Sequence, residues 1–304
     1  GIYNTATAKS HTESSGQVTD YSVTIGNDAK VGGLLGSILN QSANTKVTGS
    51  AILGFIYSGD GKNYSGHVHN TVATGTTALG EFLFENGTLN SSGVGILNDA
   101  GSVRIKGGTI NGGTYGIQNV KGTLQTILTI DGGTIKGAAG DGILNDGGQL
   151  DVSSAALISG KGGTVESGMV GIRNTNDGTV TIKGAISSLT GTQAAILIDS
   201  GKMNITSTGS ISGSGNGIQN IGTGNTAIDG RISNYELAVK NSSSGAAGTT
   251  NAASVTISAS AVITGNAGKG TAIINDGNAA LNFAGTITNY GIGIQHTNSY
   301  GTVS

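Results

Sequence analysis

Four aspartates occupy the same place in a recurring short word, where their carboxylates could be brought together. They are Asp99, Asp146, Asp199 and Asp276. Enzymes that cleave polysaccharides need paired carboxylates, with Lys or Arg nearby, to act as general acid and base. No basic residue recurs beside these positions, and the intervening copies of the word carry apolar or hydroxyl residues there. We interpret the aspartates as turn residues. Cleavage of polysaccharides by a lyase or hydrolase remains an alternative function, behind the two binding functions given below.

Two histidines, His67 and His69, are the other candidates for chemistry. Imidazole is a common metal ligand, but these residues have no Cys near them, and the nearest carboxylate is Asp60. The tandem Gly-Gly-x-Gly-x-Asp words of calcium-binding β-rolls are also absent. We therefore expect surface histidines, no metal site and no cofactor.

The word that precedes these aspartates recurs along the whole chain and determines the fold. It is apolar, most often Gly-Ile-x-Asn, and its copies close at Asn4, Asn40, Asn70, Asn98, Asn119, Asn145, Asn174, Asn220, Asn241 and Asn275. Two further copies have Ile198 and His296 in the Asn place. Successive copies are never closer than the 21 residues between Asn98 and Asn119. A fixed minimum with variable excess is typical of one unit stacked on itself.

The shortest unit, residues 95–115, shows what is stacked. It contains three apolar bursts, at Ile96, at Val103 with Ile105, and at Ile110. Apolar and polar residues alternate within the bursts, which indicates strands with one buried face. Gly, Asn or Asp follow each burst and suit tight corners. The sequence predicts an all-β, right-handed parallel β-helix of about eleven coils with three strands each, forming one elongated domain over residues 1–304.

The recurrent Asn has a structural explanation. Stacked corner asparagines can hydrogen-bond from amide to amide between coils while they also satisfy the turn backbone. We therefore expect an asparagine ladder rather than an active site. Ile198 and His296 should interrupt the ladder and form local weak points.

Insertions lengthen some coils, and we place them at residues 5–20, 53–67, 71–79, 159–168 and 242–253. The 53–67 insertion is rich in aromatic and polar residues. Its binding candidates are Tyr57, Asp60, Lys62, Asn63, Tyr64 and His67. Such residues either cap the open end of the core or recognise a glycan or protein, and both interpretations remain open.

A second candidate surface follows the outward positions of the second strand in each coil. These are short hydrogen-bonding side chains, represented by Thr129, Asp151, Thr181, Asn204, Thr256 and Asn282. They are either an ordinary solvated sheet surface or a strip along which one rod aligns antiparallel with another. Short side chains lose little entropy on ordering, so the second interpretation is physically reasonable.

Composition excludes some partners. Charged residues make up 11% of the chain and the net charge is −2, so there is no basic footprint for nucleic acid. The 56 glycines and few aromatic residues suggest low complexity, but the regular apolar positions argue against disorder.

Three repeated words carry a resemblance to a known family: Gly-Ile-Leu-Asn-Asp at 95–99 and 142–146, Gly-Ile-Gln-Asn at 116–119 and 217–220, and Gly-Gly-Thr-Ile at 107–110 and 132–135. In repeat style and composition the chain resembles the passenger domains of bacterial type V autotransporter adhesins of the self-associating, AIDA-like type. The Gly-Asp-Ser-Gly nucleophile turn of the related serine protease passengers is absent.

The resemblance implies a non-enzymatic adhesin at the bacterial cell surface, exported through the periplasm and outer membrane, that acts in aggregation and biofilm formation. The implied partner is the identical passenger on a neighbouring cell, with host glycan or matrix protein as the alternative. Contact with the membrane would be only through a C-terminal β-barrel outside this chain. We therefore expect the chain to be a piece of a longer protein.

Overall fold

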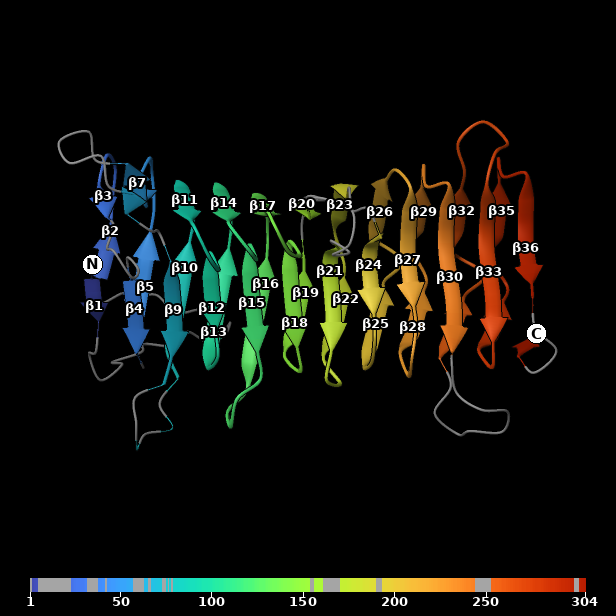
Figure 1. Ribbon diagram of the computed structural model, residues 1–304, viewed down its shortest axis with the longest axis horizontal. Helices are drawn as coiled ribbons and strands as arrows, with labels where there is room; N and C mark the ends of the chain where they lie inside the picture. Colours follow the sequence, from blue (N-terminus) through green and yellow to red (C-terminus); the bar gives the residue numbers. More distant parts are fainter. Residues whose placement is uncertain are drawn as a thin grey trace.

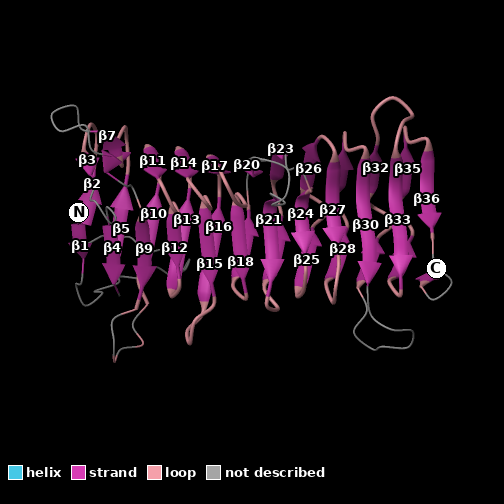
Figure 2. Cartoon of the chain, in the orientation of Figure 1, coloured by secondary structure: helices cyan, strands magenta, loops and turns pink. Residues whose placement is uncertain are grey.

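The structure is a computed structural model in which stacked coils form an all-β parallel β-solenoid (Figure 1). It describes residues 2–4, 23–31, 38–41, 43–56, 63–64, 67–72, 75, 77, 79–153, 156–160, 170–189, 193–243, 253–297 and 301–304. Within these ranges every regular element is a strand (Figure 2). The predicted all-β parallel solenoid is therefore confirmed.

Three parallel sheets run the length of the molecule, and successive strands pass from the first sheet to the second and then the third. The first sheet consists, in spatial order, of β1 (Ile2–Asn4), β4 (Ile38–Gln41), β9 (Val68–Thr71), β12 (Ile96–Asn98), β15 (Ile117–Val120), β18 (Ile143–Asp146), β21 (Val170–Thr175), β24 (Ala194–Ile198), β27 (Asn216–Asn220), β30 (Leu237–Ser243), β33 (Thr271–Gly277) and β36 (Ile292–His296).

The second sheet consists of β2 (Val23–Ile25), β5 (Asn44–Val47), β10 (Glu81–Phe84), β13 (Gly101–Ile105), β16 (Thr126–Ile130), β19 (Gln149–Val152), β22 (Thr179–Ile182), β25 (Lys202–Ile205), β28 (Asn225–Ile228), β31 (Ser254–Ile257), β34 (Ala280–Phe283) and β37 (Thr302–Val303).

The third sheet consists of β3 (Lys30–Val31), β6 (Ile52–Leu53), β11 (Thr88–Ser91), β14 (Thr109–Gly112), β17 (Thr134–Gly137), β20 (Ala156–Gly160), β23 (Ala185–Leu189), β26 (Ser210–Gly213), β29 (Arg231–Ser233), β32 (Val262–Thr264) and β35 (Thr286–Thr288). The remaining pair, β7 (Phe55–Ile56) and β8 (Asn63–Tyr64), is an antiparallel hairpin.

The core lies between the three sheets and is built from inward columns of Ile, Leu, Val and Phe. In-register pairs such as Val103 with Leu128 and Ile96 with Ile117 place equivalent side chains directly above one another, and all four are fully buried. Because side chains alternate across a strand, one polar residue between two apolar ones is enough to direct both apolar residues inward.

In two coils the second strand lacks the expected alternation of apolar and polar residues, because Thr occupies one of its inward positions. Thr45 in β5 and Thr226 in β28 are buried, and each donates its hydroxyl to the ladder amide oxygen of its own coil, that of Asn40 at 2.8 Å or of Asn220 at 3.3 Å. Leu53, predicted to begin an insertion, is instead fully buried in β6.

The other predicted insertions lie partly or wholly outside the described residues. Residues 5–20 and most of 159–168 and 242–253 are outside them. The 71–79 insertion is described only in part, and its first residue, Thr71, belongs to β9.

The recurrent asparagines form the expected ladder. The nine from Asn40 to Asn275 are fully buried, and neighbours are joined from Nδ2 to Oδ1 at 2.6–2.9 Å on both sides of Ile198. Asn145 also donates to the carbonyl oxygen of Gly148 at 2.9 Å. Each rung therefore ties one coil to the next and the first sheet to the turn that leads into the second.

Ile198 does interrupt the ladder, but its neighbours have other partners. Asn174 donates its amide to the carbonyl oxygens of Gly178 and Ser200, at 2.8 and 2.9 Å, while Asn220 accepts the hydroxyl of Thr226. The expectation for His296 was wrong. Its Nδ1 lies 3.3 Å from the Asn275 amide nitrogen and continues the ladder.

We predict that Ile143→Asp will destabilise the protein by on the order of 4 kcal/mol, because Ile143 is fully buried and an unpaired carboxylate would enter a dry core. Leu144→Asp is the matched control, since Leu144 is the adjacent, outward residue of β18. Thermal melts followed by circular dichroism should show a large drop for the first variant and a small one for the second. Equal melts would contradict the core assignment.

We predict that Asn145→Ala will cost about 1 to 3 kcal/mol, because it removes ladder bonds on both sides. Ile198→Asn should stay within about 1 kcal/mol of wild type, since restored amide bonds offset lost apolar burial. Denaturant titrations of the two variants beside wild type measure both. Unchanged midpoints for Asn145→Ala would refute a stabilising ladder.

Candidate interaction surface

The outward positions of the second sheet form one continuous column, which we call the outer column. Cα pairing from strand to strand links its members in the order Thr24, Lys46, Leu83, Arg104, Thr129, Asp151, Thr181, Asn204, Ala227, Thr256 and Asn282. All six residues predicted for the strip therefore lie in one line. They align because each sits between two inward residues of its strand, as Thr129 does between Leu128 and Ile130.

The outer column changes character along its length. Its long side chains, Lys46, Leu83 and Arg104, lie on the consecutive strands β5, β10 and β13, and from β16 onward its members are short. Lys46 is absent from the strip predicted above because the polar residue Thr45 fills the inward position beside it and masks the alternation of the strand. The only available signal was Val47, which fills the next inward position.

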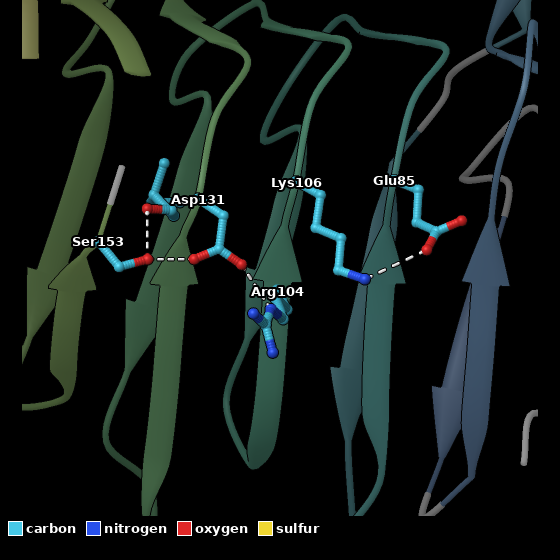
Figure 3. A network of polar contacts seen from close by, with 6 residues as sticks. Glu85, Arg104, Lys106, Asp131 and Ser153 are labelled. Carbon is cyan, nitrogen blue, oxygen red and sulfur yellow. Dashed lines mark hydrogen bonds and ion pairs between the residues drawn. The ribbon is translucent and has the colours of Figure 1, made fainter. Parts of the chain in front are cut away.

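Ion pairs hold the two cations of the outer column, Lys46 and Arg104, to carboxylates that directly follow neighbouring strands. Figure 3 shows the pair of Arg104 with Asp131 and that of Lys106 with Glu85. Lys46 and Lys106 contact the two carboxylate oxygens of Glu85 at 2.8 and 3.3 Å. The hydrogen bond from Lys46 is the main cause that holds the pKa of Glu85 below its usual range. These charges are thus paired within the molecule.

Arg104 is held in a similar way. Its Nε contacts Asp131 Oδ2 at 2.6 Å, and the other carboxylate oxygen of Asp131 accepts the hydroxyl of Ser153 (Figure 3). Burial raises the pKa of nearby Glu81, although the charges of Arg104 and Lys106 oppose this shift. The guanidinium is therefore fixed at one end while its side chain stays 36% exposed.

A shallow hollow of about 380 Å³ opens on the short half of the outer column. Its lining includes Thr181, Asn204, Ala227 and Thr256. Ala227 has the shortest side chain of the column and leaves room above its strand. Within the described residues, the buried Oδ1 of Asn204 has no hydrogen-bond partner. The hollow is therefore lined by a residue whose own buried acceptor is unsatisfied.

The loop candidates are only partly described. Tyr57, Asp60 and Lys62 lie outside the described residues, and Asn63 and Tyr64 are described as the backbone of β8. His67, the sixth candidate, has its Nδ1 2.7 Å from the carbonyl oxygen of Val94 in the next coil.

The two histidines are engaged in local contacts. Their rings lie 6.4 Å apart, and His69 Nε2 is 2.8 Å from Asp99 Oδ2. Burial alone would raise the pKa of Asp99, but hydrogen bonds from His69 and Thr71 outweigh it and lower that pKa. No group of three or more potential metal ligands occurs among the described residues.

The four recurring aspartates each bind a different neighbour. Asp99 pairs with His69, and Asp146 accepts the hydroxyl of Thr175 at 2.7 Å. Asp199 lies 3.4 Å from Nη1 of Arg173, and Asp276 accepts the hydroxyl of Thr297 at 2.7 Å. Each of these carboxylates therefore joins its own turn to a residue of an adjacent coil.

One buried carboxylate, Asp141, was not among the predicted residues, and it is 3% exposed. It accepts the backbone N–H of Val170 at 2.9 Å and Arg173 Nε at 2.8 Å. Burial would lower the pKa of Arg173, but Asp141 and Asp199 outweigh that effect and raise it. The cluster secures the start of β21, where the chain returns from residues 161–169.

A second hollow of about 390 Å³ lies at the corner that follows β29, between Tyr235 and the 266–270 turn. Tyr235 is fully buried, and its backbone oxygen accepts the hydroxyl of Tyr290 at 2.9 Å. Burial raises the pKa of Tyr235 above its usual range. The opposite charges of Glu236 and Lys269 line the same hollow.

Helices that could span a membrane were sought among the described residues, and none has the necessary length and apolar character.

Comparison with known proteins adds little to this description. No family model and no curated protein matches the chain. Among solved structures, the chain is similar to a TibC-catalysed, hyper-glycosylated TibA fragment, with 13% identity and a TM-score of 0.19 over 92% of this chain and 97% of the fragment. A TM-score this low carries no argument about function.

Proposed function

We propose that this protein is a non-enzymatic adhesin of the bacterial cell surface that mediates self-association, and through it aggregation and biofilm formation. Its partner would be the identical protein on a neighbouring cell, contacted antiparallel along the outer column. The proposed rod is a right-handed helix of about eleven coils, on the order of 50 Å long at about 4.8 Å per coil. Export through the periplasm and outer membrane belongs to the same proposal.

The observation that carries the proposal is the continuity of the outer column. From Thr129 to Asn282 it offers hydrogen-bonding side chains on every strand except that of Ala227, in strict register. A single such hydrogen bond contributes only about 0.5 to 1.5 kcal/mol. Many equivalent contacts along two rods, and many rods on each cell, add up to strong but reversible adhesion.

Two further observations support a binding role over an enzymatic one. The recurring aspartates are distributed among separate partners rather than gathered at one bond-cleaving centre. The cations at the long end of the outer column are paired with Glu85 and Asp131, so they do not form a free basic surface. A surface of short polar groups, of which only Asp151 carries a charge from Thr129 to Asn282, suits contact with a second copy of itself.

We predict that simultaneous replacement of Thr129, Asp151, Thr181 and Asn204 by Gly will abolish clumping of cells that display the protein. The change removes polar side chains from four consecutive strands and leaves the inward columns in place. Sedimentation of the cells in suspension is the measurement. Single replacements should have little effect because each contact is weak.

The matched control replaces four outward residues of the third sheet, Ser212, Ser233, Thr264 and Thr288, by Gly. Because Gly weakens any strand, circular dichroism must show that both variants fold. Normal clumping by the folded outer-column variant would reject the proposed surface, as would an equal loss in the third-sheet control.

A further inference from the structure

The outer column has a shape that can fit only certain alignments of two copies. One end carries long side chains, on β5, β10 and β13, and the other end carries the hollow above Ala227 on β28. A contact between two identical surfaces with two-fold symmetry must be self-complementary. A protrusion of one copy therefore has to meet a hollow of the other.

Symmetry reduces the alignment of two antiparallel rods to a single choice. The two-fold axis must lie in the interface, parallel to the strands, so that the outer column of one copy faces that of the other in reversed order. Placing the axis on one strand, or between two adjacent strands, then fixes every opposed pair. The candidates are the positions near the middle of the column, which give the longest overlap.

Three of these positions conflict with the side chains present. An axis on β19 sets Asp151 against its own copy, and like charges directly opposite are destabilising. An axis between β16 and β19 places buried, apolar Leu83 opposite Asn204, where it offers the amide no hydrogen-bond partner. An axis on β22 brings only Thr129 to the hollow, and its short side chain leaves the space unfilled.

We propose that the axis lies between β19 and β22, so that Arg104 of each copy enters the hollow above Ala227 of the other. This inference rests on the proposed self-association and specifies its register. The opposed pairs that follow from the strand order are Lys46 with Asn282, Leu83 with Thr256, Arg104 with Ala227, Thr129 with Asn204, and Asp151 with Thr181.

The chemistry of the two ends agrees with this register. Among the described residues only the Nε of Arg104 is paired, with Asp131, and a guanidinium has further N–H donors on its other nitrogens. Asn204 lies on the strand next to Ala227, and its buried Oδ1 lacks a donor. Arg104 in the hollow supplies that donor once the Asn204 amide rotates to bring Oδ1 to the surface of the hollow. Leu83 is unsuited to the role because it is already buried, at 3% exposure.

The register is tested by placing an arginine at position 227 of one copy and removing Arg104 from the other. Beads of two colours are coated with the full chain carrying either Ala227→Arg or Arg104→Ala. Beads with Ala227→Arg alone should lose clumping, because Arg104 and the new arginine then oppose each other. Mixed with Arg104→Ala beads they should form two-coloured clumps, because every contact between unlike beads again joins one arginine to one alanine.

Beads coated with the Lys46→Ala variant are the matched control, since this substitution removes another cation of the outer column and leaves Arg104 in place. They should not rescue Ala227→Arg beads, and rescue by them would assign the hollow to Lys46 and overturn the register. Absence of two-coloured clumps with Arg104→Ala, with all variants folded by circular dichroism and wild-type beads clumping, would also overturn it. Failure of the wild-type beads themselves to clump would instead reject the proposed function.

Discussion

The buried asparagine ladder is the interaction on which the rest of the structure depends. A primary amide in a dry interior is costly unless its donors and acceptor are all used, and here the partner is the same amide one coil away. In two coils the ladder leaves no room for a side chain in the turn beside it. A Cβ on Gly148 would lie 2.3 Å from Asn119 Nδ2, and one on Gly178 would lie 2.5 Å from Asn174 Oδ1. The ladder therefore accounts for the glycines at these two positions, whereas Ala43 and Ala279 occupy the equivalent place in other coils.

Register set in the interior is passed to the surface. Because each rung fixes one coil against the next, a strand cannot slip by one residue without turning its apolar side chains outward. The same constraint lines up the outward side chains, including residues far apart in sequence such as Asp151 and Asn282. Insertions between strands do not disturb this alignment. After residues 161–169, for example, Asp141 accepts the backbone N–H of Val170 and so fixes the start of β21. A repeated surface follows from a repeated core.

Much of the fold could be predicted from the sequence because its signals are local. Alternation within three or four residues identified strands such as β13 and β16, and the recurrent Asn fixed their order in each coil. The signal failed where a polar residue filled an inward slot, as Thr45 and Thr226 do, because their hydroxyls find ladder oxygens that only the folded coil supplies. The Asp141 to Arg173 contact was missed for a related reason. Its partners come from different coils, so no spacing within the sequence reports it.

The outer column could be aligned from sequence, but its hollow and its paired charges could not. Whether Lys46 or Arg104 is a free cation depends on Glu85 and Asp131, which reach them from neighbouring strands. That pairing matters for contact between identical molecules. Unpaired cations on the column would repel their copies as two rods approach, whereas paired ones leave only short-range shape and hydrogen bonding to decide the fit. The internal ion pairs thus make self-contact along this face physically accessible, and they leave the Nη groups of Arg104 as donors that a second copy can use.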